Sequence, residues 1–164
     1  MEVEHHRFQD DGGFPNSPLP MLVYHEVEAA REAAACEELF DGNGWVPDWR
    51  DGIFSFQHFH TNTHEVLGIV AGEATVMLGG PKGRRFEVAQ GDVLVLPAGT
   101  GHCSLGSTPE LLVIGAYPDA MPWDLRRGDP AEHDEAVAKI RAVPLPRVDP
   151  VEGSGGALTR LWSD

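Results

Sequence analysis

Three histidines and one glutamate near the middle of the chain are spaced like the ligands of a single metal ion. His58 and His60 are separated by one residue, Glu65 follows five residues later, and His102 comes after a Pro-x-Gly turn. Side chains on an extended segment alternate between two faces, so His58 and His60 are expected on the same face. Three imidazoles and one carboxylate suit a borderline transition metal.

This ligand set predicts an open metal site. Positions left free on a five- or six-coordinate ion can accept water or a substrate oxygen, as in catalytic rather than structural sites. Several ions suit these ligands, so the expected cofactor is one divalent transition metal ion, either Fe, Mn, Ni, Co or Zn. The alternative is that the four side chains share one sheet face and are satisfied by hydrogen bonds alone.

The segment around the His-x-His pair resembles the first signature motif of the cupin superfamily. That motif reads Gly, five residues, His-x-His, four residues, Glu, six residues, Gly. Its positions are occupied here by Gly52, His58, His60, Glu65 and Gly72. The resemblance implies an all-β fold, a cupin-type antiparallel jelly-roll β-barrel, with the two histidines and the glutamate as metal ligands.

A later segment resembles the second cupin motif, which supplies the fourth ligand. Gly91, Pro97, Gly99 and His102 have its spacing. The motif often ends with Asn, and this sequence has Gly106 there. That Asn is not a metal ligand in cupins, so the departure affects a supporting hydrogen bond rather than the metal site.

A narrower resemblance extends over most of the chain. Segments such as GNGWVPDWRDGIFSFQHFHTNTHEVLG and LLVIGAYPDAMPWDL are similar to the uncharacterised YjlB-type bacterial cupins. This family implies no particular reaction.

Two classes of function are compatible with this site. One is a mononuclear metal enzyme, a dioxygenase or an isomerase, that acts on a small oxygenated molecule. The other is a non-catalytic cupin that binds or senses a metal or small ligand. His64 precedes Glu65, so alternation directs it outward or to the rim of the pocket, where it is the candidate proton donor rather than a ligand. Cys103 is expected to point away from the site that His102 faces.

The whole chain, residues 1–164, is expected to form one cupin domain, since its length suits one substantial core. The barrel should occupy about residues 45–118. Residues 1–44 are expected to form an N-terminal arm and helix. Residues 119–164 should contain a C-terminal helix followed by an extended tail that runs over the surface.

Periodicity predicts the helices and strands. Helical spacing predicts a helix at Glu26–Phe40, and Asp129 followed by Pro130 predicts the start of a helix at Pro130–Ala142. Apolar runs bounded by Gly and Pro predict the strands. The predicted strands are Met21–His25, Glu65–Val70, Ala74–Leu78, Arg85–Val88, Val93–Leu96 and Leu111–Tyr117.

Three tryptophans near the predicted site have two possible roles. Trp45 and Trp49 flank the first metal-binding segment, and Trp123 follows the last strong strand. Each could pack in the core or close one mouth of the barrel against a substrate.

Charge and composition limit the partners. The chain has 26 acidic and 12 basic residues and a formal charge of −14, which argues against nucleic acid and anionic membranes. No apolar stretch is long enough to span a bilayer, and the N-terminus does not resemble a secretory signal. Two cysteines fit a reducing cytoplasm. The expected partners are a small-molecule substrate or ligand and a second copy of the chain in a homodimer.

Overall fold

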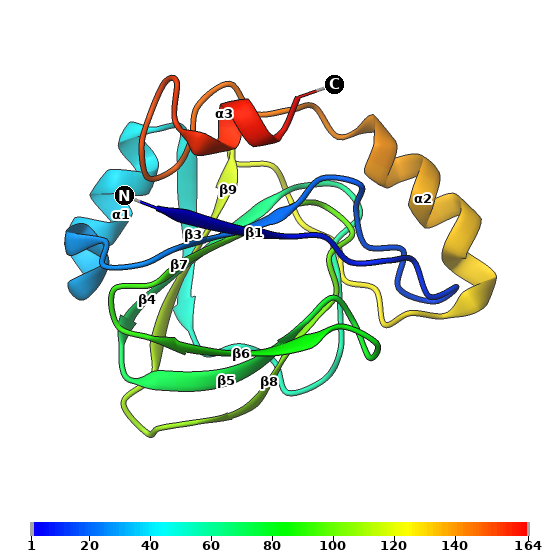
Figure 1. Cartoon of the computed structure of the whole chain (residues 1–164), viewed down its shortest axis with the longest axis horizontal. Helices are drawn as coiled ribbons and strands as arrows, with labels where there is room; N and C mark the ends of the chain where they lie inside the picture. Colours follow the sequence, from blue (N-terminus) through cyan, green and yellow to red (C-terminus); the bar gives the residue numbers. More distant parts are fainter. Residues whose placement is uncertain (1, 164) are drawn as a thin grey trace.

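Two antiparallel sheets face each other and enclose the interior of a barrel (Figure 1). The structure, a computed structural model, describes residues 2–163. The larger sheet has the strand order β1 (Val3–His6), β2 (Met21–Tyr24), β7 (Val93–Leu96), β4 (Glu65–Ala71), β9 (Leu112–Pro118) and β3 (Trp45–Asp51). The smaller sheet has the order β6 (Arg84–Ala89), β5 (Glu73–Leu78) and β8 (His102–Ser107). The predicted antiparallel jelly-roll barrel is confirmed.

Helices cover the outside of the barrel. The helical elements are η1 (Glu28–Arg31), α1 (Ala33–Gly42), η2 (Pro130–Glu132), α2 (His133–Ala142) and α3 (Ala157–Leu161). The helix predicted at Glu26–Phe40 is interrupted, because Glu32 has an extended backbone and its side chain caps α1 by accepting from Ala35 N–H. Asp129 caps the C-terminal helix as predicted, accepting from Ala131 N–H at 2.9 Å.

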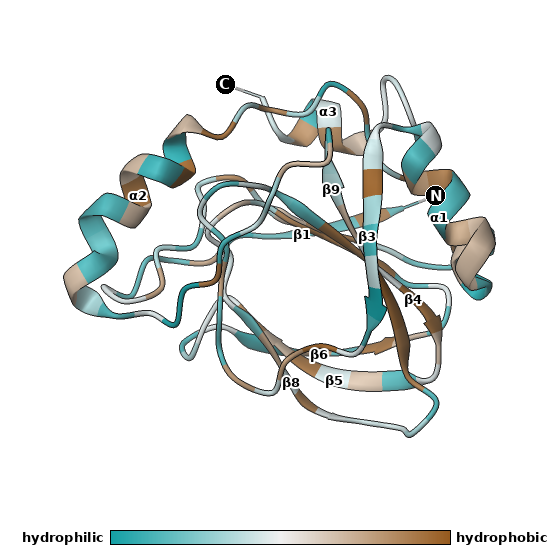
Figure 2. Ribbon diagram, turned by 180° about the vertical axis from the view of Figure 1, so that it is seen from behind, coloured by the Kyte–Doolittle hydropathy of each residue, from teal (hydrophilic) through white to brown (hydrophobic). Residues whose placement is uncertain are grey.

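Alternation along the large sheet creates two apolar layers. In β4, Leu67 and Ile69 point between the sheets, whereas Val66 points outward beneath α1. β4 lies within the large sheet and is almost wholly hydrophobic (Figure 2). Both faces of this sheet are therefore buried, as its continuous apolar strands require.

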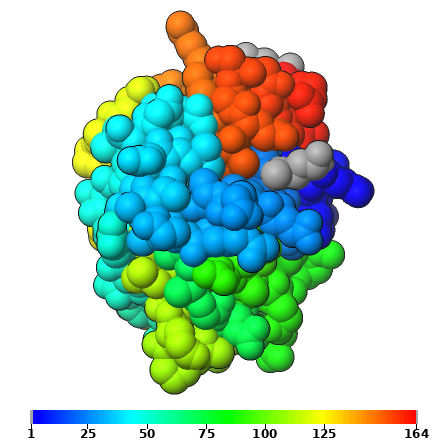
Figure 3. All heavy atoms as spheres, turned by 90° about the vertical axis from the view of Figure 1, so that its left-hand side faces the viewer, coloured from blue at the N-terminus to red at the C-terminus, as the bar shows by residue number. Residues whose placement is uncertain are grey.

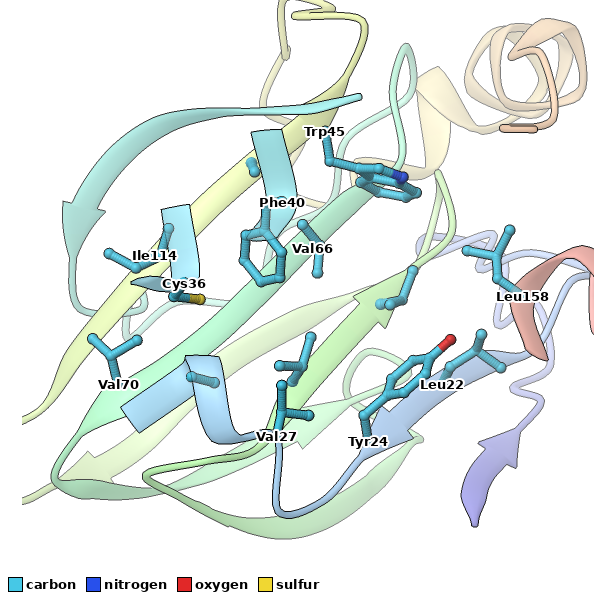
Figure 4. Packing of buried hydrophobic residues seen from close by; sticks show 14 of the residues in the cluster. Leu22, Tyr24, Val27, Cys36, Phe40, Trp45, Val66, Val70, Ile114 and Leu158 are labelled. Atoms are coloured by element: carbon cyan, nitrogen blue, oxygen red, sulfur yellow. The ribbon is translucent and has the colours of Figure 1, made fainter. Parts of the chain in front are cut away.

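The outer layer packs closely against α1. Phe40 and Cys36 from α1 meet Val66 and Ile114 from the sheet (Figure 4). Gly68 lies directly below, and a Cβ there would come within 2.5 Å of the Cys36 sulfur. Cys36 is therefore a packing residue in the core, and burial raises its thiol pKa to about 12.

The C-terminal segment folds back on the barrel instead of running over the surface, so the predicted extended tail is wrong in part. Asp149 is fully buried and accepts hydrogen bonds from Tyr24 and from three backbone N–H groups. Asn43 donates to the Pro150 carbonyl at 2.8 Å, which joins this segment to the end of α1 (Figure 3). Trp162 is buried in the outer layer. These contacts stabilise the region of α3, a helix that was not among the predictions.

The N-terminal arm contains a strand that was not among those predicted. Residues Val3–His6 form β1, which pairs with β2 at the edge of the large sheet. None of the helices within residues 2–163 is both long and apolar enough to cross a membrane.

Candidate metal centre

The His-x-His pair lies on an extended segment between β3 and β4, held by isolated bridges rather than in a regular strand. His58 and His102 exchange two backbone hydrogen bonds of 3.1 and 2.9 Å. Phe59 forms a second bridge with Arg126 on the other side. The segment is therefore fixed on both sides, and alternation still directs His58 and His60 to the same face, as predicted.

Each of the three imidazoles is oriented by a backbone carbonyl. The Nδ1 atoms of His58 and His102 lie 2.9 Å from the carbonyls of Phe56 and Thr100, and His60 Nδ1 meets the Asp124 carbonyl. A carbonyl can only accept a hydrogen bond, so each Nδ1 carries the proton and each Nε2 presents a lone pair.

The three rings converge on one point. All three histidines are buried, and their candidate ligand atoms lie within 4.8 Å of one another. The sequence prediction that these residues come together thus matches the geometry of the structure.

Glu65, the first residue of β4, lies beside two of these rings, while the group within 4.8 Å contains only the three histidines among the described residues. Its Oε1 lies 3.2 Å from His102 Nε2 and 3.5 Å from His60 Nε2. Its Oε2 accepts a hydrogen bond from the Tyr117 hydroxyl at 2.5 Å. Oε1 is buried, and among residues 2–163 no group donates a well-formed hydrogen bond to it.

Burial and mutual charge shift the titration of these groups. Burial favours the neutral form of Glu65, but His60 and His102 outweigh it and hold the carboxyl pKa well below its usual range. Burial and His102 lower the pKa of His58 to about 3. For His60 burial acts in the same direction, but the neighbouring Glu65 carboxylate raises the pKa overall.

This arrangement fits a cation. The electron pairs of three Nε2 atoms and one carboxylate oxygen face a single buried space, where they repel one another unless a proton or a metal ion lies between them. Three imidazoles and one carboxylate are the donors that a borderline divalent ion prefers. The residues therefore suit the metal that the sequence predicts.

Glu65 is in turn held by two aromatic residues that the sequence did not single out for this task. Tyr117 donates to Glu65 and accepts from the Trp49 indole N–H at 2.8 Å. Trp49 occupies the space above Gly115, where a Cβ would lie 2.0 Å from the indole ring. Gly115 is thus needed for the Trp49–Tyr117–Glu65 chain of hydrogen bonds. The signal that could have found Tyr117 is its parity on the last strand, which puts it on the inner face with Val113.

A β-bulge in β3 brings Trp49 to this position. The register shifts between Pro47 and Trp49, so Asp48 is an extra residue with no partner on β9. Trp45 and Trp49 would share a face in a regular strand. The bulge separates them: Trp45 packs in the outer core, and Trp49 points into the barrel.

The candidate ligands lie in a pocket of about 310 Å³. Its walls are mostly apolar or aromatic, and they include Trp49, Ile53, Phe54, Leu67, Tyr117 and Trp123. Trp123 lies with its ring centroid 5.4 Å from that of His60 and donates to Asp48 at 3.0 Å. Phe54 and Phe56 stack on each other, and both make T-shaped contacts with the His58 ring.

The expectation that His64 is a proton donor at the rim of the pocket is wrong. His64 is buried on the outer side of the large sheet, with its ring 4.8 Å from that of Trp162. Its Nδ1 accepts from Ala98 N–H at 2.9 Å, and its Nε2 lies 3.2 Å from the Pro144 carbonyl. It does not line the pocket, because alternation places it opposite Glu65 and the C-terminal segment covers it.

Comparison with known proteins identifies the family. The family model described as Cupin matches residues 51–120. The chain is 38% identical to the uncharacterized protein YjlB of Bacillus subtilis (strain 168) over 162 residues, which cover 98% of this chain and 97% of that protein. The chain therefore belongs to the cupins and is a small bacterial member of them.

Solved structures show weaker similarity. Hazelnut vicilin (Corylus avellana) is 14% identical with a TM-score of 0.39, covering 74% of this chain and 33% of vicilin. An oxalate decarboxylase structure from Bacillus subtilis is 19% identical with a TM-score of 0.35, covering 68% of this chain and 29% of that one. Such similarity supports neither a substrate nor a reaction for this chain.

The buried His64 predicts a specific loss of stability in acid. Burial lowers its pKa to about 4, from about 6.5 in the unfolded chain. Between these values the unfolded state binds the proton and the folded state does not, so stability falls as the pH falls from 6.5 to 4. The full effect is about 3 kcal/mol.

Urea unfolding at pH 7 and pH 4 measures this effect. Replacing His64 with Asn keeps an acceptor for Ala98 N–H, and we expect the variant to lose about 3 kcal/mol less than the wild type over this range. His133 is the control, because Asp134 and Asp10 raise its pKa and His133→Asn should change the pH dependence in the opposite direction. An unchanged pH dependence in His64→Asn would contradict the assignment.

Proposed function

We propose that this protein is a mononuclear metal enzyme, dioxygenase- or isomerase-like, that acts on a small oxygenated molecule. The observation that carries the proposal is the buried Glu65 Oε1, which lies 3.2 and 3.5 Å from the Nε2 atoms of His102 and His60 and has no well-formed hydrogen bond among residues 2–163, beside the converging histidines. His58, His60, His102 and Glu65 are the proposed ligands. A divalent Fe, Mn, Ni, Co or Zn ion bound there supplies Lewis-acid or redox chemistry to an oxygen atom of the substrate.

The residues around the ligands support catalysis by positioning and exclusion. Backbone carbonyls hold each imidazole in the tautomer that leaves Nε2 free, and Tyr117 holds Glu65. The apolar walls of the pocket keep much of the water away from the ligands, while the open mouth leaves room for a small molecule.

The alternative is a non-catalytic cupin that binds or senses a metal or small ligand. The position of His64 favours it, because the proton donor expected at the rim is buried elsewhere. Outside the proposed ligands, the titratable side chains that line the pocket are Asp48, Asp51 and Tyr117. Tyr117 already donates to Glu65, and burial together with Glu65 raises its pKa, so it is not a ready acid at neutral pH.

The ligand assignment predicts metal content. In protein purified without a nickel column, elemental analysis should find about one divalent ion per chain. Replacing His60 or His102 with Ala should remove most of this metal, because each change deletes one of the nitrogen donors.

Cys103→Ala is the matched control for these variants. Cys103 is buried next to His102 but does not belong to the group of converging ligands, so its replacement should leave the metal content nearly unchanged. Full metal occupancy in His60→Ala would show that the ion binds elsewhere or that His60 is not a ligand.

Turnover distinguishes the enzyme from the binding protein. Oxygen uptake by the metal-loaded protein with catechols, thiols and β-diketones tests the dioxygenase reaction, and loss of uptake in the metal-free His102→Ala variant assigns it to this site. A metal-loaded protein that binds small molecules in the pocket but converts none of them, with or without oxygen, would favour the alternative.

We further propose that the protein acts in the cytoplasm as a homodimer. The outermost strands are β1, β3, β6 and β8, and where no other segment pairs with their outer edges, as beyond Ser104 in β8, these edges are available to a second copy. Leu105, at a bulge in β8, leaves 48% of its surface exposed beside such an edge. Light scattering at micromolar concentration should give twice the mass of 17.8 kDa. A monomer mass would contradict the proposal.

A further inference from the structure

We propose that the pocket selects a small organic cation, with an oxygen atom directed to the metal ligands and a positively charged group held at the mouth. The holding residues are Asp48, Asp51 and the faces of Trp49 and Trp123. This inference rests on the proposed function, since it describes the substrate class of the same site.

The charge of the pocket favours a cation. Asp48 and Asp51 line it together with Glu65, and within residues 2–163 neither lysine nor arginine does. Arg50 follows Trp49 in the chain, but its guanidinium is paired with Glu37 at 2.6 and 2.9 Å. A carboxylate group placed at the mouth would thus meet two acidic side chains, with no lysine or arginine among the lining residues to hold it there.

Arg127 is the cation that borders this region. Its guanidinium lies over the ring of Phe56, 4.0 Å from the centroid, and it is not part of the pocket lining. Phe54 lines the pocket on that side, and the Phe56 ring is stacked on it. The arginine therefore supports the wall and leaves the charge of the pocket negative at its mouth.

Aromatic faces provide the second element that recognises a cation. Trp123 is stacked on Tyr117, with ring centroids 6.4 Å apart, and lies beside the His60 ring. Phe54 and Trp123 keep 48% and 38% of their surface exposed at the mouth. Exposed aromatic rings next to carboxylates attract ammonium groups through the negative potential of the ring face.

The bulge in β3 joins these two elements. Neighbouring residues of a regular strand point to opposite faces, yet Asp48 and Trp49 both line the pocket. The Trp123 indole donates to Asp48 at 3.0 Å, which fixes the carboxylate beside the second ring. Bulges next to active sites commonly re-aim side chains in this way.

Asp48 and Asp51 are not an isolated pair of surface acids, because a buried carboxylate oxygen in the same pocket independently indicates a ligand. Glu65 Oε1 is buried, lacks a hydrogen-bond donor among the described residues and faces into the pocket. The metal site thus lies at the inner end of the pocket, and Asp48 and the tryptophans lie on the way to it. A substrate with an oxygen at one end and a positive charge at the other matches both ends.

Calorimetric titration of the full-length, metal-loaded protein tests the proposal with choline as the probe. Choline has a hydroxyl for the metal site and a quaternary ammonium for the mouth. Neohexyl alcohol, in which carbon replaces the nitrogen, is its uncharged isostere. We expect choline to bind about tenfold more tightly than neohexyl alcohol, because only the cation gains from the aromatic faces and the acids.

Conservative variants assign this preference to the mouth. Asp48→Asn combined with Asp51→Asn keeps acceptors for Trp123 and Gly52 but removes both charges, so most of the preference for choline should disappear. Glu110→Gln removes one exposed charge outside the pocket and should keep the preference.

Three results would overturn the inference: equal binding of the two alcohols, no binding of choline to the metal-loaded protein, or a preference that survives in the double variant. If the protein carries metal, any of these overturns only the substrate class, and the metal site stands. A protein that does not carry metal overturns the proposed function and this inference with it.

Discussion

The buried carboxylate of Glu65 is the constraint on which the rest of the site depends. An unpaired carboxylate oxygen inside a protein is costly, and three imidazole lone pairs facing it add repulsion rather than relief. Such an arrangement is stable only when positive charge lies among these atoms. The neighbouring contacts keep these atoms free for a positive charge. Backbone carbonyls keep the imidazole protons on Nδ1, and the Tyr117 hydroxyl donates to the other carboxylate oxygen of Glu65.

The buried position of Glu65 follows from the alternation of side chains between the two faces of the large sheet. Glu65 and Leu67 point between the sheets, while His64 and Val66 point outward beneath the helices and the C-terminal segment. The start of β4 thus carries a proposed metal ligand on one face, and the residue just before it is a packing histidine on the other. Two adjacent titratable residues have opposite environments, and their pKa values follow from burial and from the charges that each one meets.

The sequence predicted the strands and the shared face of His58 and His60 because both depend on local spacing, whereas the jelly-roll barrel and the convergence of His102 with this pair were implied by the resemblance to the cupin motifs. The alternation of side chains along an extended segment puts His58 and His60 on the same face. The turn at Pro97–Gly99 precedes His102 in the sequence, so it can be recognised without knowing how the strands are arranged. Features that depend on distant contacts could not be predicted this way. Trp162 covers His64 from the far end of the chain. The extra residue Asp48 turns Trp49 to the face opposite the one that regular alternation predicts. A hydrophobic pattern of period two contains no sign of such a bulge.

These two kinds of information have different consequences for function. The predictable part, three imidazoles and a carboxylate, suits several metals and several reactions, and so it defines a class of chemistry. The unpredictable part lies beyond the proposed ligands: the bulge, the glycine beneath Trp49 and the loop that carries Trp123. These features decide the shape and the charge of the pocket in front of the proposed ligands. The substrate class proposed for this protein therefore rests on side chains outside the four proposed ligands.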